Sequence, residues 1–291
     1  MSETAIARAA ALACFSDPQD ITPLGGGITN VNLLVRDGSR RFVVRLGDDI
    51  PEHGVMRWNE LALSRAAEMA GVSPAVVHQE QGVLVLDFVD AKTFEEADVR
   101  NPANLVKIID LVARAHRDLG NHLTGPVLAF WPFQVNRTYA TRLKADGSVH
   151  SELLPALMDT LGDLEKAVGP VELVVGHNDL LAANLLDDGQ RLWLIDWEYG
   201  GFNSPLFDLA GLASNNGLSD AQENQMLEQY FEAPAEKHRR AYTAMKCASL
   251  MRETLWSMTS EIHSDLDFDY AAYTSENMGR LNAALSEFRE L

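Results

Sequence analysis

The sequence predicts an α+β fold in two lobes: a small N-terminal β-sheet lobe with one helix (residues 1–90) and a larger, mostly helical C-terminal lobe (residues 91–291). Two observations predict this division. Apolar runs of strand type, separated by turn residues, fill the first lobe, whereas the pattern from about residue 101 onward is helical. The length of 291 residues also suits two lobes of ordinary size.

The predicted N-terminal lobe begins with a helix and continues with strands. "MSETAIARAAALACF" contains a glutamate and only one arginine, so it predicts an amphipathic helix and not a signal peptide. "NVNLLVRD" and "RRFVVRLG" flank the turn "DGSR" and predict a β-hairpin, and "GVLVLDFV" predicts a further strand. Between them, "MRWNELALSRAAEMAG" predicts a helix that ends at Gly71.

The predicted C-terminal lobe contains helices, such as "ANLVKIIDLVARAHRDLG" and those from residue 220 to the end, and one strand pair. That pair is "NLLDDGQRLWLID", in which two apolar runs flank a turn of hairpin type. Because a hairpin returns the chain, Asn184 before the turn and Asp196 after it are expected at the same end. Asp179 lies five residues before Asn184, on the entering loop, and shares that end.

Composition excludes several classes of function. The formal net charge of −18 argues against general nucleic-acid binding, because lysine and arginine must neutralise phosphates, but it leaves room for a small cationic substrate. No apolar run approaches the ~18 residues that span a bilayer, so we expect a soluble cytoplasmic protein without membrane partners. Cys14 and Cys247 are too few for a disulfide framework. The oligomeric state is left open.

The stretch "GHNDLLAANLL" (176–186) places polar groups among apolar ones. The carboxylates of Asp179 and Asp196 are expected close together. Two carboxylates at 4 Å repel by ~4 kcal/mol at an effective dielectric of 20, so a cation is expected between them. Mg²⁺ prefers oxygen ligands, which Asn184 and Asp196 offer. Asp179 is then free to accept a hydroxyl proton, and the spacing of five matches that of protein kinases. His177 is expected to hold the loop by hydrogen bonds. The alternative is that these residues only cap a turn and end a strand.

Phosphoryl transfer predicts phosphate-binding residues in the N-terminal lobe. Backbone N–H groups of "GGGITN" can approach phosphates, which selects Gly25, Gly26, Gly27, Thr29 and Asn30. Arg45 is a cation among strand residues, and Glu60 on the following helix can pair with it, as a strand lysine and a helix glutamate pair in protein kinases. The alternative is a surface ion pair of small value.

Three stretches resemble the choline/ethanolamine kinase family, within the wider aminoglycoside-phosphotransferase-like kinases: "GHNDLLAANLL", "LIDWEYGGFNSPLFDLA" and "LWSMTSEIHSDLDFDYAAY". The resemblance covers nearly the whole chain. It implies a protein-kinase-like fold that uses ATP and Mg²⁺ to phosphorylate a small alcohol. By position, it implies these roles: catalytic base, Asp179; magnesium ligands, Asn184 and Asp196; ATP-phosphate contact, Arg45; structural brace of the catalytic loop, Asp208; hinge near adenine, residues 85–89 with Asp87, Phe88 and Val89.

The resemblance also indicates an acceptor pocket. Quaternary ammonium groups are recognised by aromatic faces and carboxylates, and Tyr199 and Trp256 match aromatic positions of the family's choline site; their alternative role is core packing. Asn215 stands where choline kinases often have glutamate. Glu253 stands where some relatives have a second tryptophan, and we hypothesise that it restores the missing charge.

The acceptor therefore stays open at this stage. Choline or ethanolamine fits the resemblance, while "IDWEYGG" also resembles bacterial thiamine kinases, and an aminoglycoside is a further cationic acceptor. A pseudokinase-type protein that binds a nucleotide or a cation is the non-enzymatic alternative. Consumption of ATP in the presence of an acceptor distinguishes an enzyme from such a sensor.

Overall fold

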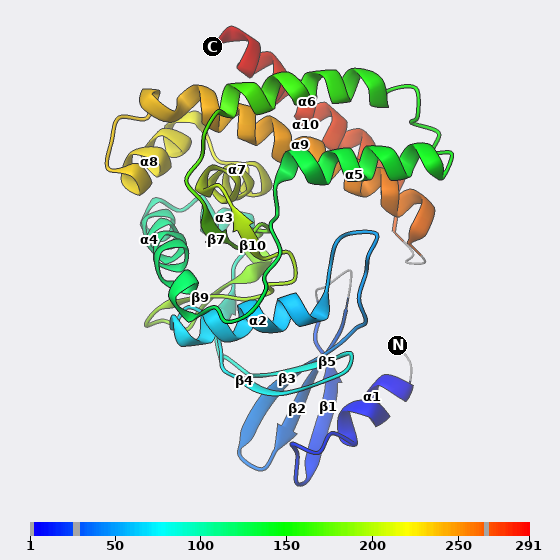
Figure 1. Ribbon diagram of the computed structural model, residues 1–291. Helices are drawn as coiled ribbons and strands as arrows, with labels where there is room; N and C mark the ends of the chain where they lie inside the picture. The colour runs from blue at the N-terminus through cyan, green and yellow to red at the C-terminus, as the bar shows by residue number, and fades with distance from the viewer. Residues whose placement is uncertain (1–2, 26–29, 265–267) are drawn as a thin grey trace.

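The N-terminal part of the computed structural model contains an antiparallel five-stranded sheet (Figure 1). The structure describes residues 3–25, 30–264 and 268–291. The strand order is β1-β2-β3-β5-β4, with these bounds: β1 Pro18–Pro23, β2 Val31–Asp37, β3 Arg40–Leu46, β4 Val76–Glu80 and β5 Val83–Asp87. The predicted hairpin is β2–β3, closed at Gly38 with a φ of 61°. The predicted third strand is β5, which pairs with β3.

The two faces of this sheet have different partners. Phe42, Val44 and Leu46 of β3 point to one face, where they pack with apolar residues of helix α1 (Glu3–Ala10) and of the segment after it. Successive side chains of a strand alternate between faces, so Arg45 points to the other face. That face is covered by helix α2 (Arg57–Met69), which lies between the sheet and the rest of the molecule (Figure 1). The position of Arg45 thus follows from strand alternation.

The C-terminal part is mostly helical, as predicted. Its helices are α3 Glu96–Val99, α4 Pro102–Asp118, α5 Pro132–Ala145, α6 Leu154–Val168, α7 Pro205–Asn216, α8 Asp220–Phe231, α9 Glu236–His263 and α10 Tyr270–Glu290. Helices α4, α5, α6 and α7 have proline in their first turn, where its missing N–H costs nothing. The side chain of Ser204 also caps α7 by accepting from Leu206 N. No helix in the described ranges is long and apolar enough to cross a membrane.

Short strands in this part correct one prediction. The predicted hairpin is present as β8 (Leu185–Asp187) and β9 (Leu192–Leu194), but β6 (Lys92–Thr93) joins it, and β7 (Val174–Gly176) pairs with β10 (Gly201–Asn203). The prediction of one strand pair in this lobe was therefore wrong. β6, β7 and β10 have at most three residues, too few to show an alternating pattern. The outer strands β1 and β4 were missed because edge strands carry fewer apolar residues.

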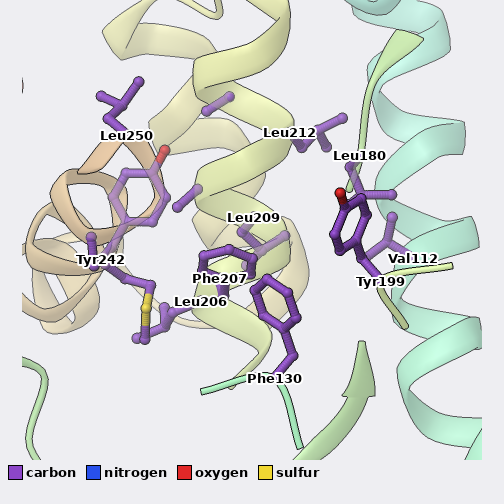
Figure 2. Close-up of a cluster of buried hydrophobic side chains, with 14 of the residues drawn as sticks. Val112, Phe130, Leu180, Tyr199, Leu206, Phe207, Leu209, Leu212, Tyr242 and Leu250 are labelled. Atoms are coloured by element: carbon purple, nitrogen blue, oxygen red, sulfur yellow. The ribbon is translucent and has the colours of Figure 1, made fainter. Parts of the chain in front are cut away.

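Helix α7 lies at the centre of the core. Its first nine residues are all buried, as expected for a helix that is apolar on nearly every side. Figure 2 shows α7 between Tyr242 and Leu250 of α9 on one side and Leu180, Tyr199 and Val112 on the other. The helix is thereby fixed close to the loop that follows β7.

The close approach of Gly201 to a neighbouring backbone gives a testable prediction. A Cβ at this position would lie 2.5 Å from the carbonyl oxygen of Leu128, which is held by Phe202 N at 2.9 Å. Gly201→Ala is expected to lower the free energy of unfolding by about 1–3 kcal/mol, because the backbone must shift. The control is Gly279→Ala, an exposed helical position with open space, which is expected to be neutral or to stabilise by up to about 1 kcal/mol. Equal urea midpoints for the two variants would contradict this account.

Candidate active site

The loop after β7 is held by a buried carboxylate. Asp208, in the first turn of α7, accepts hydrogen bonds from the backbone N–H groups of His177 (2.7 Å) and Asn178 (2.6 Å). His116 of α4 contacts the same carboxylate through Nε2 at 2.8 Å. Burial raises the pKa of Asp208, but the hydrogen bond and charge of His116 lower it by more. The net shift of the pKa is downward, so the carboxylate stays ionised. Asp208 therefore has the contacts of the predicted loop brace.

His177 and Asn178 fix the loop from inside. The His177 ring contacts Ile195 O through Nε2 (2.8 Å), and its Nδ1 accepts from Asp179 N (3.3 Å), which assigns the proton to Nε2. Burial lowers the pKa of His177, so the ring is neutral. Asn178, which the sequence analysis missed, adopts a φ of 67° and donates to Tyr199 O at 2.9 Å. These contacts orient the next residue, Asp179.

Asp179, Asn184 and Asp196 line the same cavity, of about 170 Å³. Asn184 O accepts from Ile195 N at 3.0 Å, so Asn184 and Asp196 lie at one end of the β8–β9 hairpin, as its turn predicts. The side-chain Nδ2 of Asn184 donates to Asp179 O at 2.9 Å, so the side-chain oxygen Oδ1 is not used in this bond. An amide oxygen beside a carboxylate is a donor set that suits Mg²⁺ together with substrate phosphates, so these residues fit that ion.

Asp179 has the electrostatics of a proton acceptor. Burial raises its pKa to about 8, and the nearby charge of Arg252 opposes the rise. A pKa close to the working pH is what general-base catalysis needs, because the group must be both ionised and basic. The buried position of Asp179 thus gives its carboxylate the raised pKa that a general base needs.

Arg45 is buried among carboxylates between the two lobes. Its Nη2 lies 2.6 Å from Asp196 Oδ1, 3.1 Å from Glu60 Oε1 and 3.7 Å from Glu198 Oε2. Burial lowers the pKa of Arg45, but these charges raise it more, so the guanidinium stays charged. The Arg45–Glu60 contact is therefore a buried pair and not the surface pair of the alternative interpretation.

Sequence reasoning missed a second cation in this network. Arg57 Nη1 lies 2.6 Å from Glu60 Oε2 and 3.2 Å from Glu198 Oε2. Asn30 Nδ2 also donates to Glu198 Oε2, at 3.0 Å. The available signal was the spacing of Arg57 and Glu60, since residues three apart on a helix are neighbours. The network connects α2, the start of β2 and the segment after β9.

The other predicted nucleotide residues are only partly described. Gly25 is exposed, and Gly26, Gly27 and Thr29 lie outside the described residues. Asn30 lines a cavity of about 460 Å³ with Arg45 and Glu60. In the predicted hinge, Asp87 Oδ1 contacts Arg40 Nη2 (2.5 Å), and Phe88 N donates to Arg41 O (3.1 Å). Val89 follows as a half-buried residue.

The far side of the 170 Å³ cavity is aromatic and acidic. It is lined by Tyr199, Glu253 and Trp256, all predicted acceptor residues, and we call this region the acceptor pocket. Trp256 Nε1 donates to Tyr199 OH at 3.2 Å. Arg252 and Tyr273 also line the pocket, and sequence reasoning missed both. The structure thus brings the predicted proton acceptor, metal ligands and acceptor residues to one cavity.

Asn215 does not join them. It is not among the described residues that line the acceptor pocket, so its part in acceptor binding stays a prediction. Asn215 lies about 10 Å beyond Asp208 along the axis of α7. Its neighbour Asn216 contacts the loop instead, donating to Leu180 O at 3.1 Å.

The fold and the cavity define a two-lobed, kinase-like protein. A model of the phosphotransferase enzyme family matches residues 20–246, and the chain belongs to that family. It is 24% identical to Protein LicA of Haemophilus influenzae over 91% of this chain and 79% of that protein. It is 25% identical to a probable ethanolamine kinase of Arabidopsis thaliana over 86% of this chain and 75% of that protein. A crystal structure of a choline/ethanolamine kinase family protein from Mesorhizobium loti is similar, with a TM-score of 0.79, 27% identity, and coverage of 98% of this chain and 96% of that chain.

Proposed function

We propose that this protein transfers the terminal phosphoryl group of ATP to the hydroxyl of a small cationic amino alcohol, choline or ethanolamine. One observation carries the proposal: the cavity lined by Asp179, Asn184 and Asp196 is also lined by the carboxylate of Glu253, which can attract a small cation. The names of the similar proteins from Arabidopsis thaliana and Mesorhizobium loti support this class of acceptor.

The residues of the chain divide the chemistry between them. Asp179 accepts the proton of the attacking hydroxyl, and His177 and Asp208 hold its loop in place. Mg²⁺ held by Asn184 and Asp196 would supply positive charge beside the phosphates. Arg45, which pairs with Asp196 in this structure, adds a second positive charge at the same place. Catalysis then consists mainly of positioning and charge stabilisation.

The nucleotide lies, in this proposal, between the lobes. The phosphates face Arg45, and Glu60 keeps Arg45 oriented. The purine faces residues 87–89. Because Phe88 N is already bonded to Arg41 O, we assign the purine contact to the Val89 N–H.

The test is ADP release by the purified chain with MgATP and each of four acceptors: choline, ethanolamine, thiamine and kanamycin. We expect turnover with choline or ethanolamine well above the rate without acceptor. Turnover with thiamine or kanamycin alone would replace the proposed acceptor. Binding of MgATP without ADP release for any acceptor would favour a nucleotide sensor and contradict the proposal.

A further inference from the structure

An internal cation occupies one aromatic face of the acceptor pocket. Arg252 of α9 is buried, with its Cζ 4.6 Å from the ring centroid of Tyr199 and 5.7 Å from that of Phe130. Its Nε and Nη2 have no hydrogen-bond partner among the described residues, so the rings take the place of such partners. One face of the Tyr199 ring is therefore already in contact with a positive charge.

The second predicted aromatic residue is also covered. The ring of His53, from the segment between β3 and α2, lies 5.2 Å from the Trp256 ring at an interplanar angle of 35°. Tyr270 and Tyr273 approach Trp256 edge-on, at 6.0 and 6.5 Å. Trp256 is only 7% exposed. Cation–π recognition needs a cation over a ring face. Neighbouring side chains already lie against the rings of both Trp256 and Tyr199.

The carboxylate in the pocket is suited to hydrogen bonding. Glu253 Oε2 lies 2.7 Å from Arg252 Nη1, and Tyr273 OH donates to Glu253 Oε1 at 2.8 Å. These contacts fix the carboxylate and partly neutralise its charge. A carboxylate has about four acceptor positions, so both oxygens still accept further donors. The Glu253 side chain keeps 18% exposure and lines the cavity.

From this arrangement we infer that the acceptor's charged end is a primary ammonium, held by hydrogen bonds to Glu253 and not by an aromatic cage. This inference rests on the proposed function and narrows its acceptor class. An ammonium with N–H donors can use a fixed, partly neutralised carboxylate, because hydrogen bonds are directional and short. A quaternary ammonium has no N–H donor, and it meets covered rings and a carboxylate whose charge Arg252 already offsets.

The direct test is a methylation series on the unmodified protein: ethanolamine, N-methylethanolamine, N,N-dimethylethanolamine and choline. These compounds share the hydroxyl and the chain length, so N-methylation changes the number of N–H donors and the size of the cationic group. We expect kcat/KM to fall along the series, by about tenfold or more in total, which is the value of a charged hydrogen bond. A value for choline equal to or above that for ethanolamine would overturn the inference and leave the proposed function intact. Turnover of none of the four would overturn both.

Substitution of Arg252 tests the same arrangement from the protein side. Arg252→Met removes the charge over Tyr199 at similar side-chain length, so the ethanolamine-to-choline ratio of kcat/KM is expected to fall about threefold or more. The matched control is Arg239→Met, on the same helix, where the guanidinium lies 5.8 Å from the Tyr242 ring, away from the acceptor pocket. An unchanged ratio in folded Arg252→Met would contradict the inference.

Glu253→Gln gives an independent measurement if the Arg252 variant does not fold. Glutamine keeps the size of the side chain but weakens its hydrogen bond to an ammonium. We expect the KM for ethanolamine to rise by more than the KM for choline. Equal increases for the two acceptors would indicate that Glu253 does not bind the ammonium group.

Discussion

Asp179→Asn is expected to lower kcat by about 100-fold or more while the affinity for MgATP stays nearly unchanged. Asparagine has the shape of aspartate but cannot accept the hydroxyl proton. The side chain lines the cavity, whereas the hydrogen bonds that hold the loop come from its neighbours and its backbone. The substitution should therefore leave the fold intact. The measurement combines steady-state ADP release at saturating acceptor with calorimetric binding of MgATP.

A control variant tests whether the loss of kcat is specific to Asp179. Asp163→Asn changes an exposed carboxylate on α6 that pairs only with exposed Lys166 at 3.0 Å among the described contacts, so kcat and binding should both be unchanged. If Asp179→Asn turned over its acceptor at a rate close to that of the unmodified protein, Asp179 would not be the proton acceptor. If it lost MgATP binding as well, its role would be in nucleotide binding.

Asp208→Ala is expected to lower the free energy of unfolding by about 2–5 kcal/mol, since it leaves the buried N–H groups of His177 and Asn178 without their acceptor. His116 would also lose a charged partner at 2.8 Å. Because the same groups orient Asp179, kcat should fall together with stability. Denaturant unfolding and ADP release are the two measurements.

The comparison for this variant is Asp163→Ala, at an exposed site where a change of less than about 0.5 kcal/mol is expected. Asp208→Asn is expected to lose less free energy of unfolding than Asp208→Ala. The single amide oxygen of asparagine can replace one of the two carboxylate oxygens that accept these hydrogen bonds. A loss for Asp208→Ala no greater than that for Asp163→Ala would show that the loop does not depend on this carboxylate.

Local rules explain the parts of the site that the sequence predicts. Asn184 and Asp196 come together because a hairpin turn returns the chain, and Arg45 points to the covered face because strand side chains alternate. Each rule acts within one element or one turn. The sheet strands with strong apolar patterns, β2, β3 and β5, were predicted for the same reason.

Residues supplied by long-range packing were not predictable in this way. Arg252 and Tyr273 reach the pocket from α9 and α10, and His53 reaches Trp256 from the other lobe. No spacing in the sequence predicts these contacts, because they depend on how the helices and the two lobes pack against each other. The short strands β7 and β10 carry too little pattern to identify.

The most direct measurement is a crystal structure of the protein with ADP, Mg²⁺ and ethanolamine. The account predicts an ion in contact with Asn184 and Asp196, the acceptor hydroxyl about 3 Å from the carboxylate of Asp179, and the ammonium group at Glu253. An ion bound away from both Asn184 and Asp196, or an acceptor hydroxyl out of reach of Asp179 with the lobes closed, would contradict it.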